Sequence, residues 1–377
     1  MARAVTFQLF ALLGERRFAP RLCAFRQGWN CMHASPRILI VRLTAMGDVI
    51  HGLPVATALR RQFPDAMIAW AVEGRAAELI EGHPDLDAVV NLPRRWWRSV
   101  RTAKTVRRQL RELNFDVAVD LQCLTKSAVV AWMSGAKRRL GVAGRNGREL
   151  SKTLNNELTD VRASHVVEHY LGILEPLGIV DPEVEFKMPE RESDATFAIE
   201  SLSRLALAGQ QFAVLNPGAG WPSKLWPAER YGQLARHLWS EHGIKSLAVW
   251  CGSDERQLAQ QIVDTSDGLA VLAPSTTMTQ LAAITRRASL FVGSDTGPMH
   301  LSVAVGTPTI SLHGTSRAEW CGAYGPTNAC LQAFYQDGSA RERRQADNTA
   351  MRAIDLSMVT EACDKMLSTQ NKLAKAS

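Results

Sequence analysis

Asp48 stands at a point in the chain where a carboxylate could take part in a reaction. It follows the apolar run 37–43 in Thr44-Ala-Met-Gly47-Asp48, where a strand pattern gives way to a helical one. Glycine at such a junction lets backbone N–H groups approach a ligand, and a helix start has unpaired donors. A carboxylate there can accept a proton from a hydroxyl group, but an aspartate at this place most often caps the helix. The residue alone leaves both roles open.

Lys224, in the second half of the chain, has the surroundings of an anion site. It lies in a loop with two glycines, Asn216-Pro-Gly-Ala-Gly220-Trp-Pro-Ser-Lys224, which leads to a proline that can open a helix. A lysine there can neutralise an anionic oxygen, for example one of a diphosphate. The loop lacks the G-x-x-x-x-G-K-[ST] pattern, so hydrolysis of a nucleoside triphosphate loses its main support. A solvated loop lysine is the other interpretation.

A pair of acids follows a later strand pattern in the same half. Asp254 and Glu255 come directly after Trp250-Cys-Gly252-Ser. A carboxylate at a strand end can accept both ribose hydroxyl groups of a nucleotide. An exposed acid in the first turn of a helix also complements the helix dipole, so a purely structural role is the alternative.

A second candidate anion site has the sequence Ser294-Asp295-Thr296-Gly297-Pro-Met-His300. It joins a strand pattern to a helix, and its amides, its threonine hydroxyl and the helix start suit a phosphate group. Two such loops in one half of the chain, with a carboxylate in the other, indicate a ligand that carries a diphosphate.

The elements that must position these residues follow the order of a parallel α/β protein. Short β-branched runs alternate with longer amphipathic stretches, the pattern of βα units. The predicted strands are 37–43, 67–72, 87–92, 116–121, 212–216, 245–250, 269–272, 289–292 and 307–312. The predicted helices include 49–63, 74–82, 98–113, 125–134, 168–177 and 355–369. Two consecutive Rossmann-like domains result, with a ligand in the cleft that faces the carboxyl ends of both sheets.

We expect four segments along the chain. Residues 1–35 form an N-terminal extension, either disordered or the product of an upstream start, because Met32 directly precedes the first strand pattern. Residues 36–185 form the first Rossmann-like domain and residues 193–350 the second, joined by a linker at about 180–192. Residues 351–377 form a C-terminal helix that could pack back on the first domain.

Composition excludes several classes of protein. The 377 residues include 46% hydrophobic and 21% charged residues, as in an ordinary globular protein. The seven cysteines form no Cys-x-x-Cys pair, which favours free thiols in a reducing cytoplasm over a zinc ribbon or a disulfide scaffold. The net charge of +7 raises the question of nucleic acid, but residues 1–31 hold five arginines and one glutamate. The charge of the remaining chain is modest, so we expect no nucleic-acid partner.

The ordered motifs resemble glycosyltransferase family 9, the heptosyltransferases. The resemblance runs from about residue 36 to 335 and rests on Met46-Gly-Asp48, Lys224-x-Trp-Pro227, Gly252-x-Asp254-Glu255 and Ser294-Asp-Thr-Gly-x-x-His300. The segments 94–96 and 120–127 are similar to the lipopolysaccharide heptosyltransferase I branch of the family. The family has the GT-B fold, in which two Rossmann-like βαβ domains face a cleft.

The resemblance implies a role for each motif. It implies that Asp48 is the general base of an inverting, metal-independent transfer, and that Lys224 with the 295–297 turn holds the diphosphate of an ADP-sugar. It implies that Asp254 or Glu255 binds the ribose, and that His300 supports the turn or contacts the donor. The full donor-binding set is Thr44, Gly47, Lys224, Asp254, Glu255, Thr276, Asp295, Thr296, Gly297 and His300.

The resemblance also implies the substrates. The donor would be ADP-heptose, and the acceptor would be the Kdo sugar of lipid A-Kdo at the inner face of the inner membrane, reached from the cytoplasm without a transmembrane segment. No cofactor is implied. The candidate acceptor-binding residues are Arg94, Arg95, Arg98, Gln122, Lys126 and Arg148. The alternatives are another GT-B transferase, a sugar-nucleotide epimerase, or a non-catalytic binder of nucleotide-sugar or nucleic acid.

Overall fold

The first half of the chain forms a six-stranded, fully parallel sheet. The computed structural model describes residues 35–144 and 147–376. The strands pair in the order β3-β2-β1-β4-β5-β6. Their bounds are β1 Arg37–Val41, β2 Met67–Glu73, β3 Ala88–Leu92, β4 Val117–Asp120, β5 Arg138–Val142 and β6 Glu157–Thr159. The expectation for residues 1–35 lies almost wholly outside the described residues.

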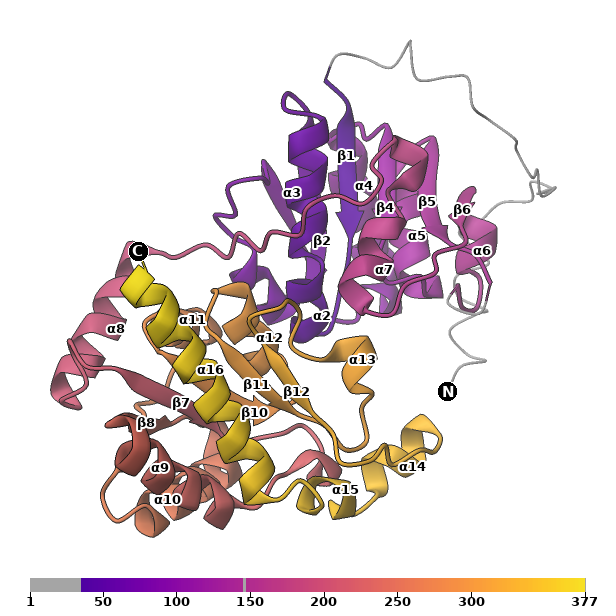
Figure 1. Ribbon diagram of the computed structural model, residues 1–377. Helices are drawn as coiled ribbons and strands as arrows, with labels where there is room; N and C mark the ends of the chain where they lie inside the picture. The colour runs from indigo at the N-terminus through magenta and orange to yellow at the C-terminus, as the bar shows by residue number, and fades with distance from the viewer. Residues whose placement is uncertain (1–34, 145–146, 377) are drawn as a thin grey trace.

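Helices cover both faces of this sheet (Figure 1). They are α2 Met46–His51, α3 Leu53–Gln62, η2 Gly74–Leu79, η3 Trp96–Arg98, α4 Val100–Glu112, α5 Thr125–Ser134, α6 Ser151–Leu154, α7 Val166–Gly172 and η4 Glu175–Leu177. The predicted helix 49–63 is divided at Gly52, because Pro54 has no N–H group to continue the hydrogen-bond ladder and instead opens α3.

The second half repeats the architecture with a second parallel sheet. Its strands pair in the order β12-β11-β10-β7-β8-β9. Their bounds are β7 Phe212–Asn216, β8 Lys245–Ala248, β9 Ala270–Leu272, β10 Leu290–Ser294, β11 Thr309–Leu312 and β12 Ala329–Leu331. When β7 is counted as the first strand and the list is read from β9, this is the same order as in the first sheet. Both sheets therefore have the doubly wound Rossmann order with one reversal point each.

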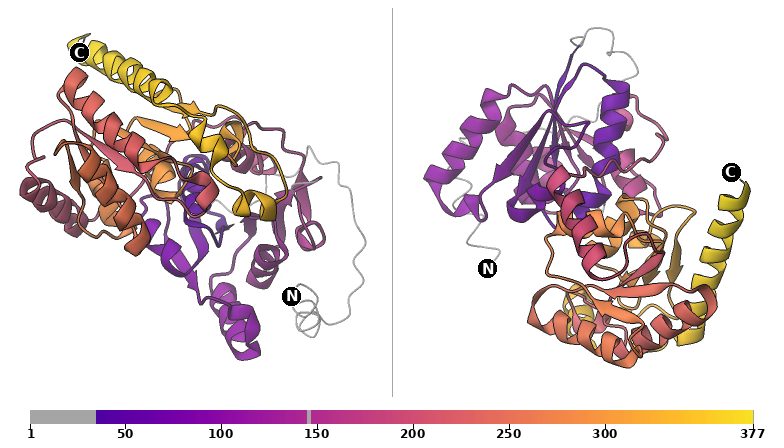
Figure 2. Two further views of the ribbon diagram at one scale, coloured as in Figure 1. Left: turned by 90° about the horizontal axis from the view of Figure 1, so that it is seen from below. Right: turned by 90° about the vertical axis from the view of Figure 1, so that its left-hand side faces the viewer.

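The helices of the second half are α8 Glu192–Arg204, η5 Pro222–Lys224, α9 Ala228–His242, α10 Gly252–Thr265, α11 Met278–Thr285, α12 Gly297–Ala304, α13 Ala318–Cys321, α14 Ala340–Gln345, α15 Thr349–Arg352 and α16 Leu356–Ala376. Figure 2 shows the two halves as two lobes that meet along one side. Residues 179–191 join the lobes without helix or strand.

The C-terminal helix α16 lies on the second lobe. Its contacts are with α9, β11 and β12, and its apolar residues Val359, Cys363 and Leu367 are buried in the core of the second sheet. Figures 1 and 2 show it, in yellow, along that lobe. The sequence allowed this helix to pack back on the first domain, but its apolar stripe is covered by the second sheet instead.

The two lobes share apolar packing. One cluster of buried side chains includes Ile38 and Val49 from the first half together with Phe291 and Met299 from the second. Val49 belongs to α2, which follows β1, and Met299 belongs to α12, which follows β10. The contact between the lobes therefore places the carboxyl ends of β1 and β10 near each other.

Candidate functional site

The candidate residues gather at the reversal points of the two sheets. The loops after β1 and β4 carry Asp48 and Gln122, and the loops after β7 and β10 carry Lys224 and Asp295. In each sheet these two strands are neighbours from which the chain proceeds in opposite directions. Ligands of doubly wound sheets bind in the crevice at such points, outside the carboxyl ends of the strands. The fold thus directs both sets of loops to one region.

Asp48 is held in place from two directions. Its Oδ2 accepts a hydrogen bond of 3.1 Å from the backbone N–H of Ala45 and forms an ion pair with Nη2 of Arg42. The Asp48 side chain is 39% exposed, whereas that of Arg42 is 9% exposed. Both of these contacts fall on Oδ2. Asp48 therefore caps its helix and at the same time presents a carboxylate to a substrate, so the two roles do not exclude each other.

Sequence reasoning missed Arg42. It follows β1, its guanidinium lies 5.3 Å from the ring centroid of Tyr170, and its Nη1 donates to the carbonyl of Leu121 at 3.5 Å. Burial works to lower its pKa, but the charge of Asp48 and its other neighbours raise the pKa overall. Arg42 is a permanent positive charge directly behind the candidate base. A charged residue at the end of a buried strand was the signal that could have identified it.

Gln122 supports the same loop from the next strand. Its Oε1 accepts from the backbone N–H groups of Leu43 at 2.9 Å and Thr44 at 3.4 Å. Asp120 fixes Gln122 in turn, accepting from its backbone N–H at 3.1 Å and from the side chain of Asn155 at 3.0 Å. Burial raises the pKa of Asp120 despite these hydrogen bonds. Gln122, predicted to bind the acceptor, thus positions the loop of the candidate base.

Lys224, Asp295 and His300 form a buried network in the second lobe. The Lys224 ammonium donates to Oδ2 of Asp295 at 2.6 Å and to its backbone carbonyl at 3.2 Å. Nε2 of His300 donates to the other carboxylate oxygen at 3.0 Å. Burial alone would raise the pKa of Asp295, but the His300 hydrogen bond and the Lys224 charge hold it well below its usual range. The predicted support of the Asp295 turn by His300 is present in this geometry.

A histidine pair links this network to the first lobe. Nε2 of His51, in α2, lies 3.0 Å from Nδ1 of His300, in α12. Since Nε2 of His300 donates to a carboxylate, its Nδ1 accepts from His51 when the ring is neutral. Burial and the neighbouring His300 and His165 lower the pKa of His51 well below its usual value. His51 is therefore neutral, and it connects α2, which carries Asp48, to the turn at residues 295–297.

Gly47 of the first lobe lies against His300 of the second. A Cβ atom at this position would stand 2.7 Å from Cδ2 of His300, whose ring is already fixed by Asp295 and His51. The donor-binding role implied for Gly47 stays a prediction. What the structure adds is a steric reason for glycine between Met46 and Asp48.

We expect Gly47→Ala to lower the free energy of unfolding by about 1–3 kcal/mol, because an added methyl group must displace a fixed ring. The displacement should also move Asp48, and a misplacement of about 1 Å costs about 100-fold in rate. Urea unfolding and the transfer rate measure the two effects. Gly220→Ala is the control for stability, since nothing lies within 4 Å of its Cβ position; an equal loss of unfolding free energy in both variants would contradict the steric explanation.

The nucleotide candidates differ in orientation. Glu255 accepts from the backbone N–H of Cys251 at 2.8 Å, and its carboxylate fills the space beside Gly218, where a Cβ would be 2.3 Å from Cδ. Burial raises the pKa of Glu255, although the Cys251 hydrogen bond opposes this. Asp254 is exposed and accepts from Ser253. Glu255 is therefore the acid that turns toward the loop after β7.

The threonine candidates lie around the start of α12. Thr296 precedes this helix, accepts from Nδ2 of Asn216 at 3.2 Å, and leaves the helix without a side-chain cap. Gly297 is the first helical residue. Thr276 is half-buried in the loop between β9 and α11, whose Met278 faces Gly297. Pro298 has no N–H group, and those of Met299 and His300 donate to the Thr296 carbonyl at 3.1 and 3.2 Å. Among the described residues of this first turn, the N–H of Gly297 is thus the donor left to meet an anion.

The candidate acceptor residues do not form one group. Arg94, Arg95, Arg98 and Arg148 are exposed, and none of them pairs with a carboxylate among the residues that the structure describes. The first three follow β3, at the same edge of the sheet as the loop of the candidate base. Lys126 is different.

Lys126 is already paired inside the first lobe. Its ammonium contacts Oε2 of Glu73 at 2.6 Å and lies 4.4 Å from the ring centroid of Trp97. Oε1 of the same glutamate accepts from Nε1 of Trp96 at 3.0 Å. The Glu73 side chain is 5% exposed, so Lys126 neutralises a buried acid. An acceptor contact by Lys126 has to coexist with this pair.

Asp295 also lies near two potential metal ligands. One ligand atom each of Asp295, His313 and Cys321 lies within 4.8 Å of the others. Burial lowers the pKa of His313 to about 4 and raises that of the Cys321 thiol. Both carboxylate oxygens of Asp295 are engaged by Lys224 and His300, so this group belongs to the network described above.

Two lobes of this type, with their reversal points facing each other, define the GT-B class of glycosyltransferase folds. A family model described as "Glycosyltransferase family 9 (heptosyltransferase)" matches residues 103–350, and the chain belongs to this family. The resemblance predicted from the motifs is thereby confirmed, as are the fold class and the glycosyltransferase nature of the enzyme.

Curated relatives and solved structures agree with this assignment. The chain is 29% identical over 302 residues to lipopolysaccharide heptosyltransferase 1 of Pseudomonas aeruginosa, covering 78% of this chain and 83% of the relative. Identity to the Escherichia coli K12 enzyme of the same name is 25%, covering 79% and 93%. A glycosyl transferase family 9 structure from Veillonella parvula has a TM-score of 0.76 at 22% identity, covering 90% and 99%. E. coli heptosyltransferase WaaC with ADP has a TM-score of 0.67 at 22% identity, covering 88% and 98%.

Proposed function

We propose that this enzyme transfers L-glycero-D-manno-heptose from ADP-heptose to the Kdo sugar of the lipopolysaccharide inner core. One arrangement of residues carries the proposal. An exposed carboxylate, Asp48, pairs with Arg42 on one lobe, and Lys224 pairs with Asp295 on the other. The His51–His300 contact joins the two groups. Relatives named lipopolysaccharide heptosyltransferase 1 support the substrate class. A WaaC structure with ADP-2-deoxy-2-fluoro heptose supports the donor.

The reaction requires a base on one side of the sugar and positive potential on the other. Asp48 accepts the proton of the acceptor hydroxyl as its oxygen attacks the anomeric carbon. The bond from that carbon to the diphosphate oxygen breaks, and the electron pair leaves with ADP. Lys224 and the N-terminus of α12 stabilise the charge on the diphosphate. Attack opposite the leaving group inverts the anomeric centre, and we assign no step to a metal.

Lys224 retains a donor for this purpose. An ammonium group has three N–H donors, and Asp295 accepts from two of them through Oδ2 and its backbone carbonyl. Within the described residues the third meets no oxygen acceptor, and the ammonium lies 4.5 Å from the ring centroid of Trp221. We infer that this third donor meets a diphosphate oxygen. Asp295 therefore orients the lysine, and the lysine contacts the donor.

For the ribose we propose Glu255 over its neighbour. Glu255→Gln should weaken ADP binding by about 10-fold or more, because a hydrogen bond to a charged group contributes about 1.5–3 kcal/mol. Asp254→Asn is the matched control and should change the affinity less than twofold, since Asp254 points to Ser253. Calorimetric titration with ADP measures both. The opposite order of effects would assign the ribose to Asp254.

A basic strip on the first lobe supports an acceptor at an anionic surface. It continues from Arg94, Arg95 and Arg98 into helix α4, where Arg101, Lys104 and Arg108 are exposed. Phosphates and carboxylates of a lipid A-Kdo surface would attract such a strip, as anionic membranes attract clustered lysine and arginine. None of the helices in the described ranges is long and apolar enough to cross a membrane. We place the enzyme at the cytoplasmic face of the inner membrane, held peripherally.

Incubation with ADP-heptose and Kdo-lipid A tests the proposed reaction. We expect one ADP released for each acceptor that gains the mass of one heptose, and no turnover of the donor without acceptor. An epimerase would convert ADP-heptose alone, and another GT-B transferase would leave this acceptor unchanged with this donor. Either result would overturn the proposed function.

A further inference from the structure

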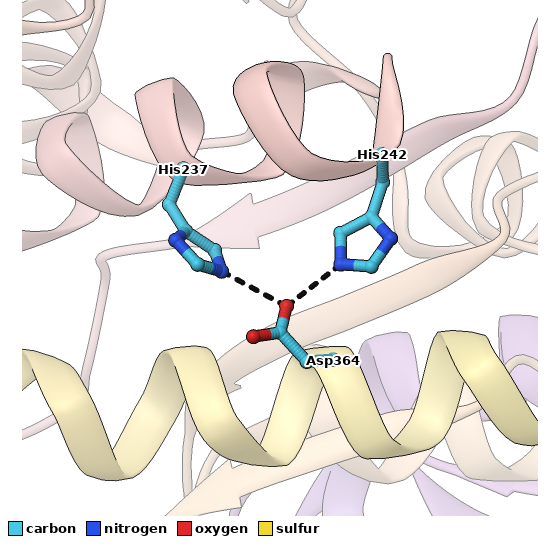
Figure 3. A group of neighbouring side chains, drawn as sticks. All are labelled: His237, His242 and Asp364. Carbon is cyan, nitrogen blue, oxygen red and sulfur yellow. Dashed lines mark hydrogen bonds and ion pairs between the residues drawn. The ribbon is translucent and has the colours of Figure 1, made fainter.

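Two histidines and an aspartate converge on the outer side of the second lobe. His237 and His242 lie in the last two turns of α9, and Asp364 lies in α16. Nε2 of His237 is 2.9 Å and Nε2 of His242 is 2.7 Å from Oδ1 of Asp364. Figure 3 shows both rings turned toward the one carboxylate across the gap between the helices. The cluster joins segments that are 122 and 127 residues apart.

This cluster stands apart from the transfer site. Helix α9 begins just after Lys224, at the carboxyl edge of the sheet, and runs back to the opposite edge, where β8 begins. His237 and His242 are at that far end. The function proposed above does not use them, and the packing of α16 on α9 does not by itself require two imidazoles on one oxygen.

The ligand atoms have the types and spacing of a transition-metal site. One imidazole nitrogen from each histidine and one oxygen of Asp364 lie within 4.8 Å of one another. Zinc binds imidazole nitrogen and carboxylate oxygen at about 2.0–2.2 Å, so bound ligands stand roughly 3–3.5 Å apart around it. Small rotations of these side chains are enough to reach that arrangement. Gly243, whose backbone adopts the left-handed conformation, ends α9 directly after His242, so the His242 ring lies at a free helix end.

The charge and exposure of the cluster suit a cation from solution. The side chains of His237, His242 and Asp364 are 25%, 16% and 41% exposed, so an ion can enter without unfolding. A carboxylate is ordinarily ionised at neutral pH, so Asp364 offers a negative charge to a cation. Three protein ligands leave a fourth position for water, as zinc sites often do.

We propose that His237, His242 and Asp364 bind a Zn²⁺ ion that fastens the C-terminal helix α16 to α9. The two Nε2 atoms and a carboxylate oxygen replace their hydrogen bonds with bonds to the metal. Each Nε2 gives up the proton that it donates to Asp364, and the neutral ring carries its proton on Nδ1 instead. The ion is structural: it ties together two helices that cover the second sheet, at the edge away from the transfer reaction. Imidazole and carboxylate ligands favour zinc over Mg²⁺, which prefers all-oxygen sites.

The test uses the full-length protein after treatment with EDTA, with Cys321→Ser in every variant to remove the Asp295–His313–Cys321 cluster. Titration with ZnCl₂ should show one ion per chain, and Tm should rise because a ligand that binds only the folded state stabilises it. MgCl₂ at the same concentration should leave Tm unchanged. His242→Gln and Asp364→Asn should each weaken zinc binding at least 10-fold and abolish the rise in Tm.

Glu241→Gln is the matched control. It removes an exposed carboxylate next to His242 that accepts a hydrogen bond from Ser240 and makes no contact with the cluster, so zinc affinity should stay within twofold of the parent protein. Far-UV circular dichroism without metal checks that the variants fold. The proposal is overturned if the parent shows no rise in Tm with zinc, or if His242→Gln and Asp364→Asn bind zinc as the parent does. In either case the three residues form only a hydrogen-bonded contact between helices.

Discussion

Replacing Asp48 with asparagine is expected to reduce heptose transfer by about 100- to 10,000-fold, the range that a positioned general base contributes. The amide oxygen can still accept from the N–H of Ala45, so the helix start is retained, but the side chain can no longer take a proton. The groups that we propose for the diphosphate and the ribose, Lys224 and Glu255, lie on the other lobe, so the variant should bind ADP as tightly as the parent enzyme does. Single-turnover transfer with Kdo-lipid A and calorimetric titration with ADP separate the two quantities.

The ion pair with Arg42 makes a control necessary. Arg42 is 9% exposed, and removal of its partner leaves a buried charge less well compensated. The variant will therefore lose some stability, and the assay has to be run well below its Tm. Asp65→Asn removes an exposed carboxylate elsewhere on the first lobe and should leave both stability and turnover unchanged. Transfer by Asp48→Asn within 10-fold of the parent enzyme would show that another group takes the proton.

The strands that carry the site were predictable from the sequence because they are buried on both faces. Of the strands at the reversal points, the predicted range for β7 agrees with the structure at both ends, and those for β1, β4 and β10 agree within two residues, since all four are continuous apolar runs. The strands that the sequence did not reveal are β5, β6 and β12. β6 and β12 are edge strands of three residues, and β5, next to an edge, begins with two arginines. An edge strand needs less apolar surface, so its pattern is weak.

The side-chain partners of the site were not predictable in the same way. The family resemblance implied acceptor contacts for Gln122 and Lys126, but the structure engages these residues with Leu43 and Glu73, which are 79 and 53 residues away. Nothing in local sequence specifies such a contact. The link from His51 to His300 spans 249 residues and depends on how the lobes meet. Motifs identified the loops, and only the tertiary contacts show which side chains in them are held by distant residues.

Lys224→Met is expected to lower both stability and donor affinity. The variant leaves the Asp295 carboxylate with His300 but without its ammonium partner, and breaking a buried ion pair costs about 3–5 kcal/mol. Because the pKa of Asp295 is lower in the folded state, the ion pair contributes its full stabilisation above the pKa of an aspartate in the unfolded chain, about 3.9. This stabilisation is lost as the pH falls through the lower pKa of the folded state. Urea unfolding at pH 7 therefore measures it in full. Lys365→Met, an exposed lysine of α16, is the control.

A double variant separates the two roles of the lysine. In Lys224→Met/Asp295→Asn no unpaired carboxylate remains, so part of the lost stability should return. ADP affinity should stay at least 10-fold below that of the parent enzyme, because the third donor of the ammonium is still missing and a charge-assisted hydrogen bond contributes about 1.5–3 kcal/mol. If ADP affinity recovers together with stability, Lys224 acts only by holding Asp295. The diphosphate would then be bound at the N-terminus of α12, and Lys224 would be a positioning residue.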